Sequence, residues 1–268
     1  VVEPDPIVPT ERCAGQNITA DISCIDVEGR ESIVYLPESL NADTNLALFL
    51  HGAPGAPNKV MEIFGAKQLA NNKNLIALAP IGNGSDYEWS SRNSATELTN
   101  ADIDYIRMLI DKVRAEQSLP AEKVYVFGYS AGGFMAYKLA CETPELVTAI
   151  ISLAGQYRGD ISACTTSTPL VVHHFHSTSD TDVPFLGREF GDIASVRDTM
   201  SVWENKNGCS GEVVTTETVG VTAASAKTTT ETNLGCSHSL VLSIMDAVDH
   251  EDDYLGERLL DHIDYIFE

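Results

Sequence analysis

The chain has 268 residues, and 39 acidic side chains against 17 basic ones give it a net charge of −22. This length fits one domain with a sizeable core, or at most two small ones. So acidic a surface repels phosphate backbones and anionic lipids, and no apolar run approaches the ~20 residues of a membrane span, so we expect neither nucleic acid nor a membrane as partner. The composition, 43% hydrophobic, indicates a soluble globular protein.

Strands and helices alternate through the first half of the chain. Residues 1–30 are rich in Pro, Glu and Asp and predict an irregular lead-in that packs onto the domain. Leu46–Leu50 is continuously apolar, which is typical of a strand buried on both faces of a parallel sheet. We predict further strands at 32–36 and 75–79, a helix at 60–70, and a helix with Ile103 to Val113 on its apolar stripe that ends near Pro120.

The second half continues the alternation. We predict strands at 124–127, 147–154, 170–176 and 240–245, a hairpin or edge strands at 213–219 and 226–230, and helices at 134–140, 192–206 and along the stripe Leu255 to Ile266. Buried strands between helices predict an α/β fold, with a doubly wound, mostly parallel sheet covered by helices on both faces. Residues 31–268 are expected to form one catalytic domain without a large lid.

The cysteines predict disulfides. They fall into sequence-local pairs: Cys13 with Cys24, Cys141 with Cys164, and Cys209 with Cys236. Short loops favour pairing within each pair, and the spacing matches no zinc motif. Buried free thiols in a cytosolic enzyme are the alternative. The chain opens at Val1 without a leader, so a signal peptide could already have been removed, and we expect a secreted or periplasmic protein that is monomeric.

A predicted strand runs directly into the motif Gly128-Tyr129-Ser130-Ala131-Gly132, and a predicted helix follows. In this context Gly-x-Ser-x-Gly forms a tight turn that exposes the serine hydroxyl. The glycines leave room for neighbouring backbone, and the helix directs free N–H groups at the turn. We therefore interpret Ser130 as a nucleophile; the alternative is an ordinary Gly/Ser turn.

A serine nucleophile needs a carboxylate that orients its base, and in this strand order the carboxylate follows a later strand. Asp180 and Asp182 both lie in the loop after the strand 170–176, on similar sides of an extended segment. We favour Asp180 and retain Asp182; either could also be a turn former.

The histidine should follow the last strand of the sheet. His250 lies just past 240–245 and before the closing helix, whereas His238 precedes that strand and His262 lies within the helix, where we expect it to be solvated. His250 is therefore the predicted base, and a surface histidine in an acidic loop is the alternative.

Two backbone N–H groups are expected to form an oxyanion hole. One belongs to Ala131, directly after the nucleophile, and the other should lie in the loop after Leu46–Leu50, where we choose Ala53. The side chain of His51 is expected to brace that loop rather than take part in chemistry.

Aromatic residues near these loops are candidates for contact with substrate. Trp89 and Tyr87 lie in a polar, Gly- and Ser-rich stretch, and Tyr129 precedes the nucleophile. Loop packing is the alternative role for Trp89 and Tyr87.

Neither a metal ion nor a cofactor is expected. His173, His174 and His176 are close in sequence, but no third ligand matches the pair that shares a face. The acidic stretch 249–253 lacks the Asp-x-Asp-x-Asp-Gly pattern of a calcium loop.

Taken together, these motifs resemble one family. The resemblance is carried by His51-Gly52, Trp89, Gly128 to Gly133, Ala140-Cys141, His176 to Asp180 with Val183-Pro184-Phe185, Trp203, Asn207-Gly208-Cys209 and His250. The chain is similar, over residues 30–268, to the polyhydroxybutyrate depolymerase and feruloyl/acetylxylan esterase group, carbohydrate esterase family one in the broad sense. The resemblance implies an α/β-hydrolase fold, secretion, and a metal-free Ser130–Asp180–His250 triad, and it supports Asp180 over Asp182.

The sequence departs from the family at two places. Ser177 stands where the family usually has Gly, and Ala247-Val248-Asp249-His250-Glu251-Asp252 stands where the family often has Gly-x-Gly-His-x-Trp. The expected substrate is an ester on a polymer, either feruloyl or acetyl groups on plant polysaccharide or, as an alternative, an aliphatic or aromatic polyester such as polyhydroxybutyrate or polyethylene terephthalate. A serine peptidase and a non-catalytic binding module are less favoured alternatives.

Overall fold

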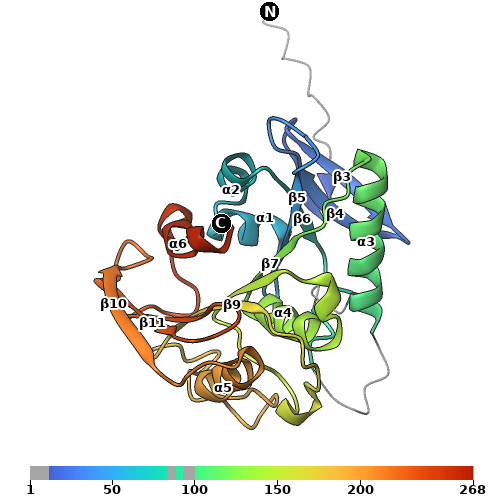
Figure 1. Cartoon of the computed structure of the whole chain (residues 1–268). Helices are drawn as coiled ribbons and strands as arrows, with labels where there is room; N and C mark the ends of the chain where they lie inside the picture. The colour runs from blue at the N-terminus through green and yellow to red at the C-terminus, as the bar shows by residue number, and fades with distance from the viewer. Residues whose placement is uncertain (1–11, 84–87, 93–99, 268) are drawn as a thin grey trace, which may run out of the picture.

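A computed structural model of the chain describes residues 12–83, 88–92 and 100–267 (Figure 1). Within these ranges ten strands form one sheet in the order β10-β11-β12-β9-β8-β7-β5-β6-β4-β3. Its centre is parallel and consists of β5 (Asn45–Leu50), β6 (Leu75–Pro80), β7 (Val124–Tyr129), β8 (Ala149–Leu153), β9 (Val171–Ser177) and β12 (Leu240–Met245). The edges are antiparallel and consist of β3 (Ile22–Val27), β4 (Arg30–Tyr35), β10 (Val213–Val219) and β11 (Lys227–Asn233). The predicted mostly parallel sheet is confirmed.

Helices cover both faces of the sheet (Figure 1). One face carries α1 (Pro57–Ile63), α2 (Ala66–Lys73) and α6 (Gly256–Ile263), and the other carries α3 (Ala101–Gln117), α4 (Ala131–Glu142) and α5 (Val196–Asn207). In β5, Leu46, Leu48 and Leu50 enter the core under α3 to α5, while Ala47 and Phe49 enter the opposite core. This alternation explains why the whole strand is apolar, since neither of its faces meets water.

The structure differs from the prediction at three places. Residues 1–11 of the predicted lead-in lie outside the described residues, and its described part is more regular than expected, because β1 (Arg12–Cys13) pairs with β2 (Gln16–Asn17) and β3 is an edge strand of the main sheet. The helix predicted at 60–70 is two helices, separated at Gly65, whose φ of 58° is left-handed. The helix predicted from residue 192 begins at Val196, where the Ser195 side chain accepts the N–H of Asp198 as its N-cap.

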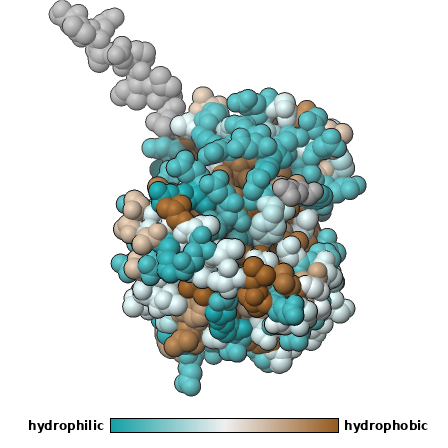
Figure 2. Space-filling view, turned by 60° about the vertical axis from the view of Figure 1, so that its left-hand side comes forward, coloured by the Kyte–Doolittle hydropathy of each residue, from teal (hydrophilic) through white to brown (hydrophobic). Residues whose placement is uncertain are grey.

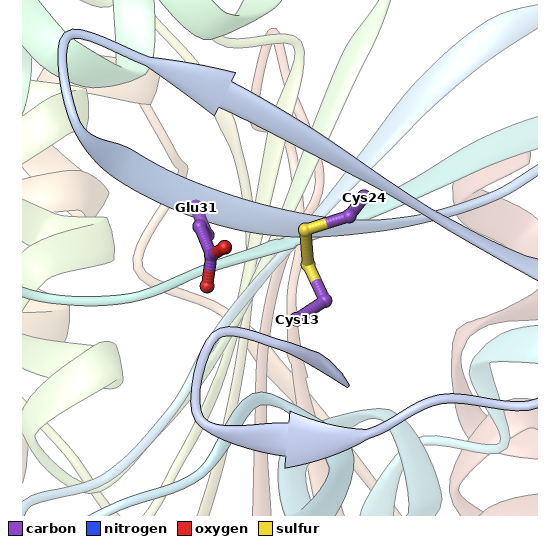
Figure 3. Close-up of side chains that lie close together, drawn as sticks. All are labelled: Cys13, Cys24 and Glu31. Carbon is purple, nitrogen blue, oxygen red and sulfur yellow. A yellow bond between two sulfur atoms is a disulfide. The ribbon is translucent and has the colours of Figure 1, made fainter. Parts of the chain in front are cut away.

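Disulfides join Cys13 to Cys24, Cys141 to Cys164 and Cys209 to Cys236, the same local pairs that the sequence suggests. Cys13–Cys24 ties the N-terminal hairpin to β3, beside Glu31 (Figure 3). Among the described residues this is the group of Cys, His and acidic side chains that lies within metal-binding distance. Its sulfurs are bonded to each other and the Glu31 carboxylate accepts the Ala14 N–H, so the group offers no thiolate ligands.

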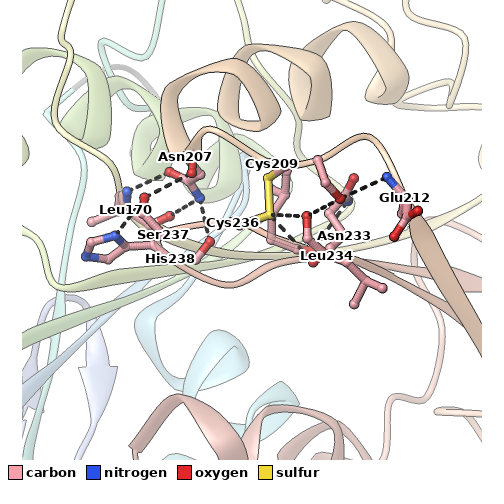
Figure 4. Close-up of a disulfide and its surroundings, with 11 residues drawn as sticks. Leu170, Asn207, Cys209, Glu212, Asn233, Leu234, Cys236, Ser237 and His238 are labelled. Atoms are coloured by element: carbon pink, nitrogen blue, oxygen red, sulfur yellow. Dashed lines mark hydrogen bonds between the residues drawn. A yellow bond between two sulfur atoms is a disulfide. The ribbon is translucent and has the colours of Figure 1, made fainter.

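The Asn207-Gly208-Cys209 motif fastens the start of β9 to the start of β12 (Figure 4). The Asn207 side chain accepts the N–H of Leu170 and donates to the carbonyl oxygens of Leu170 and His238. Gly208 ends α5 in the left-handed conformation, and Cys209 then reaches Cys236. This motif is structural and lies away from Ser130, at the N-terminal ends of the strands.

Much of the surface is hydrophilic, as the net charge requires, with patches of apolar residues on the face shown in Figure 2. In the part of the chain that the structure describes, no helix combines the length and the apolar character that crossing a membrane requires.

Candidate active site

Ser130 occupies the turn between β7 and α4. Its φ of 53° and ψ of −118° are strained for a residue with a side chain. A Cβ on Gly132 would lie 1.9 Å from the carbonyl oxygen of Leu50, and one on Gly128 would lie 2.3 Å from that of Gly132. The motif therefore needs both glycines, because backbone occupies the space that a side chain would take.

The structure brings Ser130, His250 and Asp180 together from three separate loops. Ser130 Oγ lies 2.8 Å from His250 Nε2, and His250 Nδ1 lies 2.7 Å from Asp180 Oδ2. A carboxylate accepts hydrogen bonds, so Nδ1 carries the proton and Nε2 presents its lone pair to the serine hydroxyl. Ser130 is 8% exposed and Asp180 5% exposed, so this path is shielded from bulk water at both ends.

The loop after β9 holds Asp180 by its second oxygen. Asp180 Oδ1 accepts the N–H groups of Asp182 at 3.0 Å and Val183 at 2.9 Å. Asp182 is exposed and lies at the pocket rim instead. Of the two aspartates that sequence reasoning left open, the structure places Asp180 against His250.

The backbone of His250 is held from two sides. The hydroxyl groups of Tyr129 and Tyr254 donate to its carbonyl oxygen at 2.8 and 3.3 Å. Sequence reasoning assigned Tyr129 to substrate and missed Tyr254, since no motif marks it. Tyr129 lines the pocket with its ring, which stacks on His250, and holds the loop with its hydroxyl.

The other histidines that were considered lie elsewhere. His238 precedes β12, at the opposite end of the strand from His250. His262 is half-buried and bonds to Thr218 at 3.1 Å, and burial lowers its pKa. The expectation that His262 is solvated is therefore wrong, because α6 packs it against the sheet.

The predicted oxyanion donors flank the serine. Ala131 is the first residue of α4, so its N–H belongs to the helical turn that has no acceptor within the helix. Ala53 lies in the loop after β5, and both alanines line the pocket with Ser130. This loop comes close enough that a Cβ on Gly52 would lie 3.2 Å from the Cβ of Ser130.

His51 braces the loop, as expected. Its Nε2 accepts the N–H of Gly82 at 3.2 Å and its Nδ1 donates to the Gly52 carbonyl at 2.6 Å. Burial lowers the pKa of His51, which keeps the ring neutral in this role. Trp89 donates to the His51 carbonyl at 2.9 Å and is 5% exposed, so it is both a wall of the pocket and part of this brace.

A pocket of about 500 Å³ opens above Ser130. Its apolar walls include Trp89, Phe134, Phe190 and Ile193, and its basic side chains are Lys59, Arg92, Arg158 and Arg188. Sequence reasoning missed most of these, because no motif marks the positions that carry them: Lys59 and Phe134 lie in α1 and α4, and the others lie in loops. Tyr87, another predicted substrate contact, lies outside the described residues.

His173, His174 and His176 are fully buried in β9, and each ring nitrogen lies within hydrogen-bond distance of a protein atom. Burial lowers the pKa of all three, that of His176 to about 4. The rings are thus neutral and engaged with protein atoms.

Comparison with known proteins gives a family and several relatives. The family model described as the alpha/beta hydrolase fold matches residues 46–189, which is more than half of the chain. The NocK protein of Nocardia uniformis subsp. tsuyamanensis, named as an esterase, is 29% identical over 67% of this chain and 54% of its own length. Feruloyl esterase D of Neurospora crassa is 24% identical over 74% of this chain and 67% of its own length.

Among solved structures, the acetyl xylan esterase from Aspergillus awamori superposes with a TM-score of 0.64, at 16% identity, over 91% of this chain and 99% of that one. The match confirms the fold predicted from the motifs. The resemblance to feruloyl and acetylxylan esterases is confirmed as well, since both kinds occur among the relatives matched by sequence. The chain spans about half the length of NocK.

Proposed function

We propose that this chain, which belongs to the family of the α/β-hydrolase fold, is a serine-dependent carboxylic-ester hydrolase. The observation that carries the proposal is the continuous hydrogen-bond path from Ser130 through His250 to Asp180. The esterases among the relatives support it.

In the proposed reaction Ser130 Oγ attacks the ester carbonyl and its proton passes to His250 Nε2. Asp180 orients the ring and stabilises the imidazolium that forms. The N–H groups of Ala131 and Ala53 bind the oxyanion, at about 3–4 kcal/mol of transition-state stabilisation per donor. His250 then protonates the leaving alcohol, and water repeats the sequence on the acyl-enzyme and restores Ser130.

The substrate that we propose is an ester attached to a polymer, with feruloyl or acetyl esters of plant polysaccharide as the first choice. The aromatic walls of the pocket suit an aromatic acyl group. The disulfides support a secreted or periplasmic location, because disulfides persist in oxidising compartments.

A polyester is the second candidate. Leu186 and Phe190 are 84% and 83% exposed, and Phe190 lines the pocket above Ser130. The exposed Phe190 ring at the entrance favours contact with an apolar chain longer than the pocket.

The deciding experiment has two parts. A fluorophosphonate probe should label the native chain and leave Ser130→Ala unlabelled; equal labelling of the two would sink the proposal. Turnover of methyl ferulate, acetylated xylan, polyhydroxybutyrate and a terephthalate polyester then ranks the substrates. Cleavage of a peptide anilide with no turnover of p-nitrophenyl acetate would assign a peptidase instead.

A further inference from the structure

A chain of buried side chains lies beneath the loop that carries Asp180. The Tyr137 hydroxyl is 3.0 Å from His174 Nδ1, His174 Nε2 is 3.0 Å from His176 Nδ1, and His176 Nε2 is 2.7 Å from the Val183 carbonyl oxygen. All three side chains are fully buried, Tyr137 from α4 and the histidines from one face of β9. Water therefore does not compete for these hydrogen bonds.

The hydrogen bonds of this series, from Tyr137 to Val183, all donate in one direction. The carbonyl oxygen of Val183 only accepts, so His176 Nε2 must carry a proton. Burial lowers the pKa of both histidines, so each ring is neutral and holds one proton. His176 Nδ1 then accepts from His174 Nε2, and His174 Nδ1 accepts from the Tyr137 hydroxyl. The Val183 end fixes this arrangement, and the phenol at the other end can supply the donor that His174 Nδ1 requires.

The last member of this chain reaches the Asp180 loop at two points. The Val183 residue whose carbonyl binds His176 also donates its N–H to Asp180 Oδ1 at 2.9 Å. His176 Nε2 itself lies 3.5 Å from Asp180 Oδ2, the oxygen that binds His250. The orientation of the carboxylate thus depends on where His176 holds the backbone of this loop.

We propose that Tyr137, His174 and His176 are positioning residues, which fix the Asp180 carboxylate for His250 through a hydrogen-bond chain that ends on Val183. The inference rests on the proposed function, because it assigns these residues to the same reaction. They act through Asp180 and have no contact with the substrate.

The opposite face of β9 provides a matched control. His173 is also fully buried, its Nε2 lies 2.9 Å from Ser243 Oγ, and its Nδ1 lies 3.2 Å from the Tyr265 hydroxyl. Tyr137→Phe and Tyr265→Phe therefore remove the same hydroxyl from the same kind of histidine. Tyr137 alone of the two is linked by the hydrogen bonds above to Asp180.

The first test is the steady-state kinetics of both variants with p-nitrophenyl acetate. We expect Tyr137→Phe to lower kcat about tenfold with KM within about twofold, since a displaced triad member costs rate rather than ground-state binding. Tyr265→Phe should keep the native kcat even if its Tm falls equally. Equal kcat in the two variants overturns the inference, and a native chain that turns over no ester overturns the proposed function instead.

A second pair of variants guards against a failure of Tyr137→Phe to fold. His176→Gln keeps an N–H that can reach the Val183 carbonyl, whereas His176→Leu does not. We expect His176→Gln to retain a kcat several-fold above that of His176→Leu, about fivefold or more. Equal kcat values would show that volume at this position matters and the hydrogen bond does not.

The direction of the chain is tested without turnover, by NMR of the native protein labelled with ¹⁵N-histidine. His174 and His176 should each show a protonated Nε2 and an unprotonated Nδ1 at neutral pH. A proton on Nδ1 of either ring, or a charged ring, overturns the inference and leaves the proposed ester hydrolysis intact.

Discussion

Ser177 Oγ accepts a hydrogen bond from the backbone N–H of Val248 at 3.3 Å. Ser177 and the segment around His250 are the two places at which the motifs quoted above depart from the family pattern, and the structure puts them in contact. The same oxygen accepts the N–H of Ser179 at 3.1 Å, so one hydroxyl joins the Asp180 loop to the His250 loop. A glycine at position 177 could not make this connection. The two departures are therefore linked by one hydrogen bond.

Replacing Ser177 tests this link. In Ser177→Ala the buried N–H of Val248 loses its acceptor, and we expect a loss of about 1–3 kcal/mol in the free energy of unfolding. Urea unfolding followed by fluorescence measures it. Ser179→Ala, at an exposed neighbour, should stay within about 0.5 kcal/mol of the native chain. A loss as large in Ser179→Ala would contradict the role given to Ser177.

Tyr129 should matter for rate through its hydroxyl. Burial raises the pKa of this phenol, so it remains a donor to the His250 carbonyl across the working pH range. Tyr129→Phe keeps the ring against the substrate and removes the donor, and we expect kcat to fall about fivefold with little change in KM. In Tyr254→Phe, which removes the longer bond, the loss should be smaller. A change confined to KM would assign Tyr129 to substrate binding alone.

Variants of the two aspartates in the loop after β9 should differ clearly in activity. Asp180→Asn removes the carboxylate that fixes the proton on His250 Nδ1, and we expect kcat to fall by about 10³–10⁴. Asp182→Asn, at the exposed rim, should stay within about threefold. The hydrolysis of p-nitrophenyl acetate measures both, and a reversed order would mean that Asp182 is the orienting residue.

Phe190 should contribute more to polymers than to small esters. Burial of a phenyl ring against a polymer stabilises binding by about 1.5–3 kcal/mol. Phe190→Ser should therefore lower the rate at which soluble products form from a solid polyester about tenfold or more. The kcat/KM for p-nitrophenyl acetate should fall less than about threefold. Val219→Ser, on the far edge strand β10, removes a side chain that is 58% exposed and serves as control. Parallel losses in Phe190→Ser on both substrates would place Phe190 in the acyl pocket.

The buried histidines predict how stability depends on pH. Burial lowers the pKa of His173, His174 and His176, the last to about 4, whereas in the unfolded chain it is about 6.5. Between these values the unfolded state binds more protons, so stability is complete above about pH 6.5 and declines as the pH falls toward 4. His176 alone accounts for about 3 kcal/mol of this loss.

Urea midpoints at about pH 7.5, 6 and 5 measure this decline, over a range in which most carboxylates remain ionised. His176→Gln should be less stable at neutral pH and show a shallower dependence. A native midpoint that stays constant from about pH 7.5 to 5 would contradict the neutral, buried state of these rings.

The strands and the tight turn at Ser130 could be predicted from sequence because each has a local cause. An apolar run such as Leu46–Leu50 is required wherever both faces of a strand are buried. The tight turn around Ser130 needs glycine at the positions where neighbouring backbone comes close, so five consecutive residues are enough to predict it. Chain order then points to His250 without any knowledge of distances.

Other features depend on contacts that no local pattern encodes. Asp180 and Asp182 share one loop, and the one directed inward accepts the N–H groups of Asp182 and Val183 and lies 3.5 Å from His176. The break at Gly65 interrupts a run that is otherwise typical of one helix. Tyr254 reaches His250 across a bend, a contact between two positions that carry no motif. Such residues are found only when the loops are folded together.

The loops of the parallel sheet lie at its two ends, one set after the strands and one set before them. The segments that surround Ser130 follow the strands, whereas residues 36–44, 118–123, 164–170 and 234–239 precede β5, β7, β9 and β12 and contain none of the residues that line the pocket. The Cys209–Cys236 disulfide reinforces that second set (Figure 4). A tether or a fused module inserted there would leave the pocket facing outward, so this end of the sheet is the natural attachment point for immobilising the protein on a solid support.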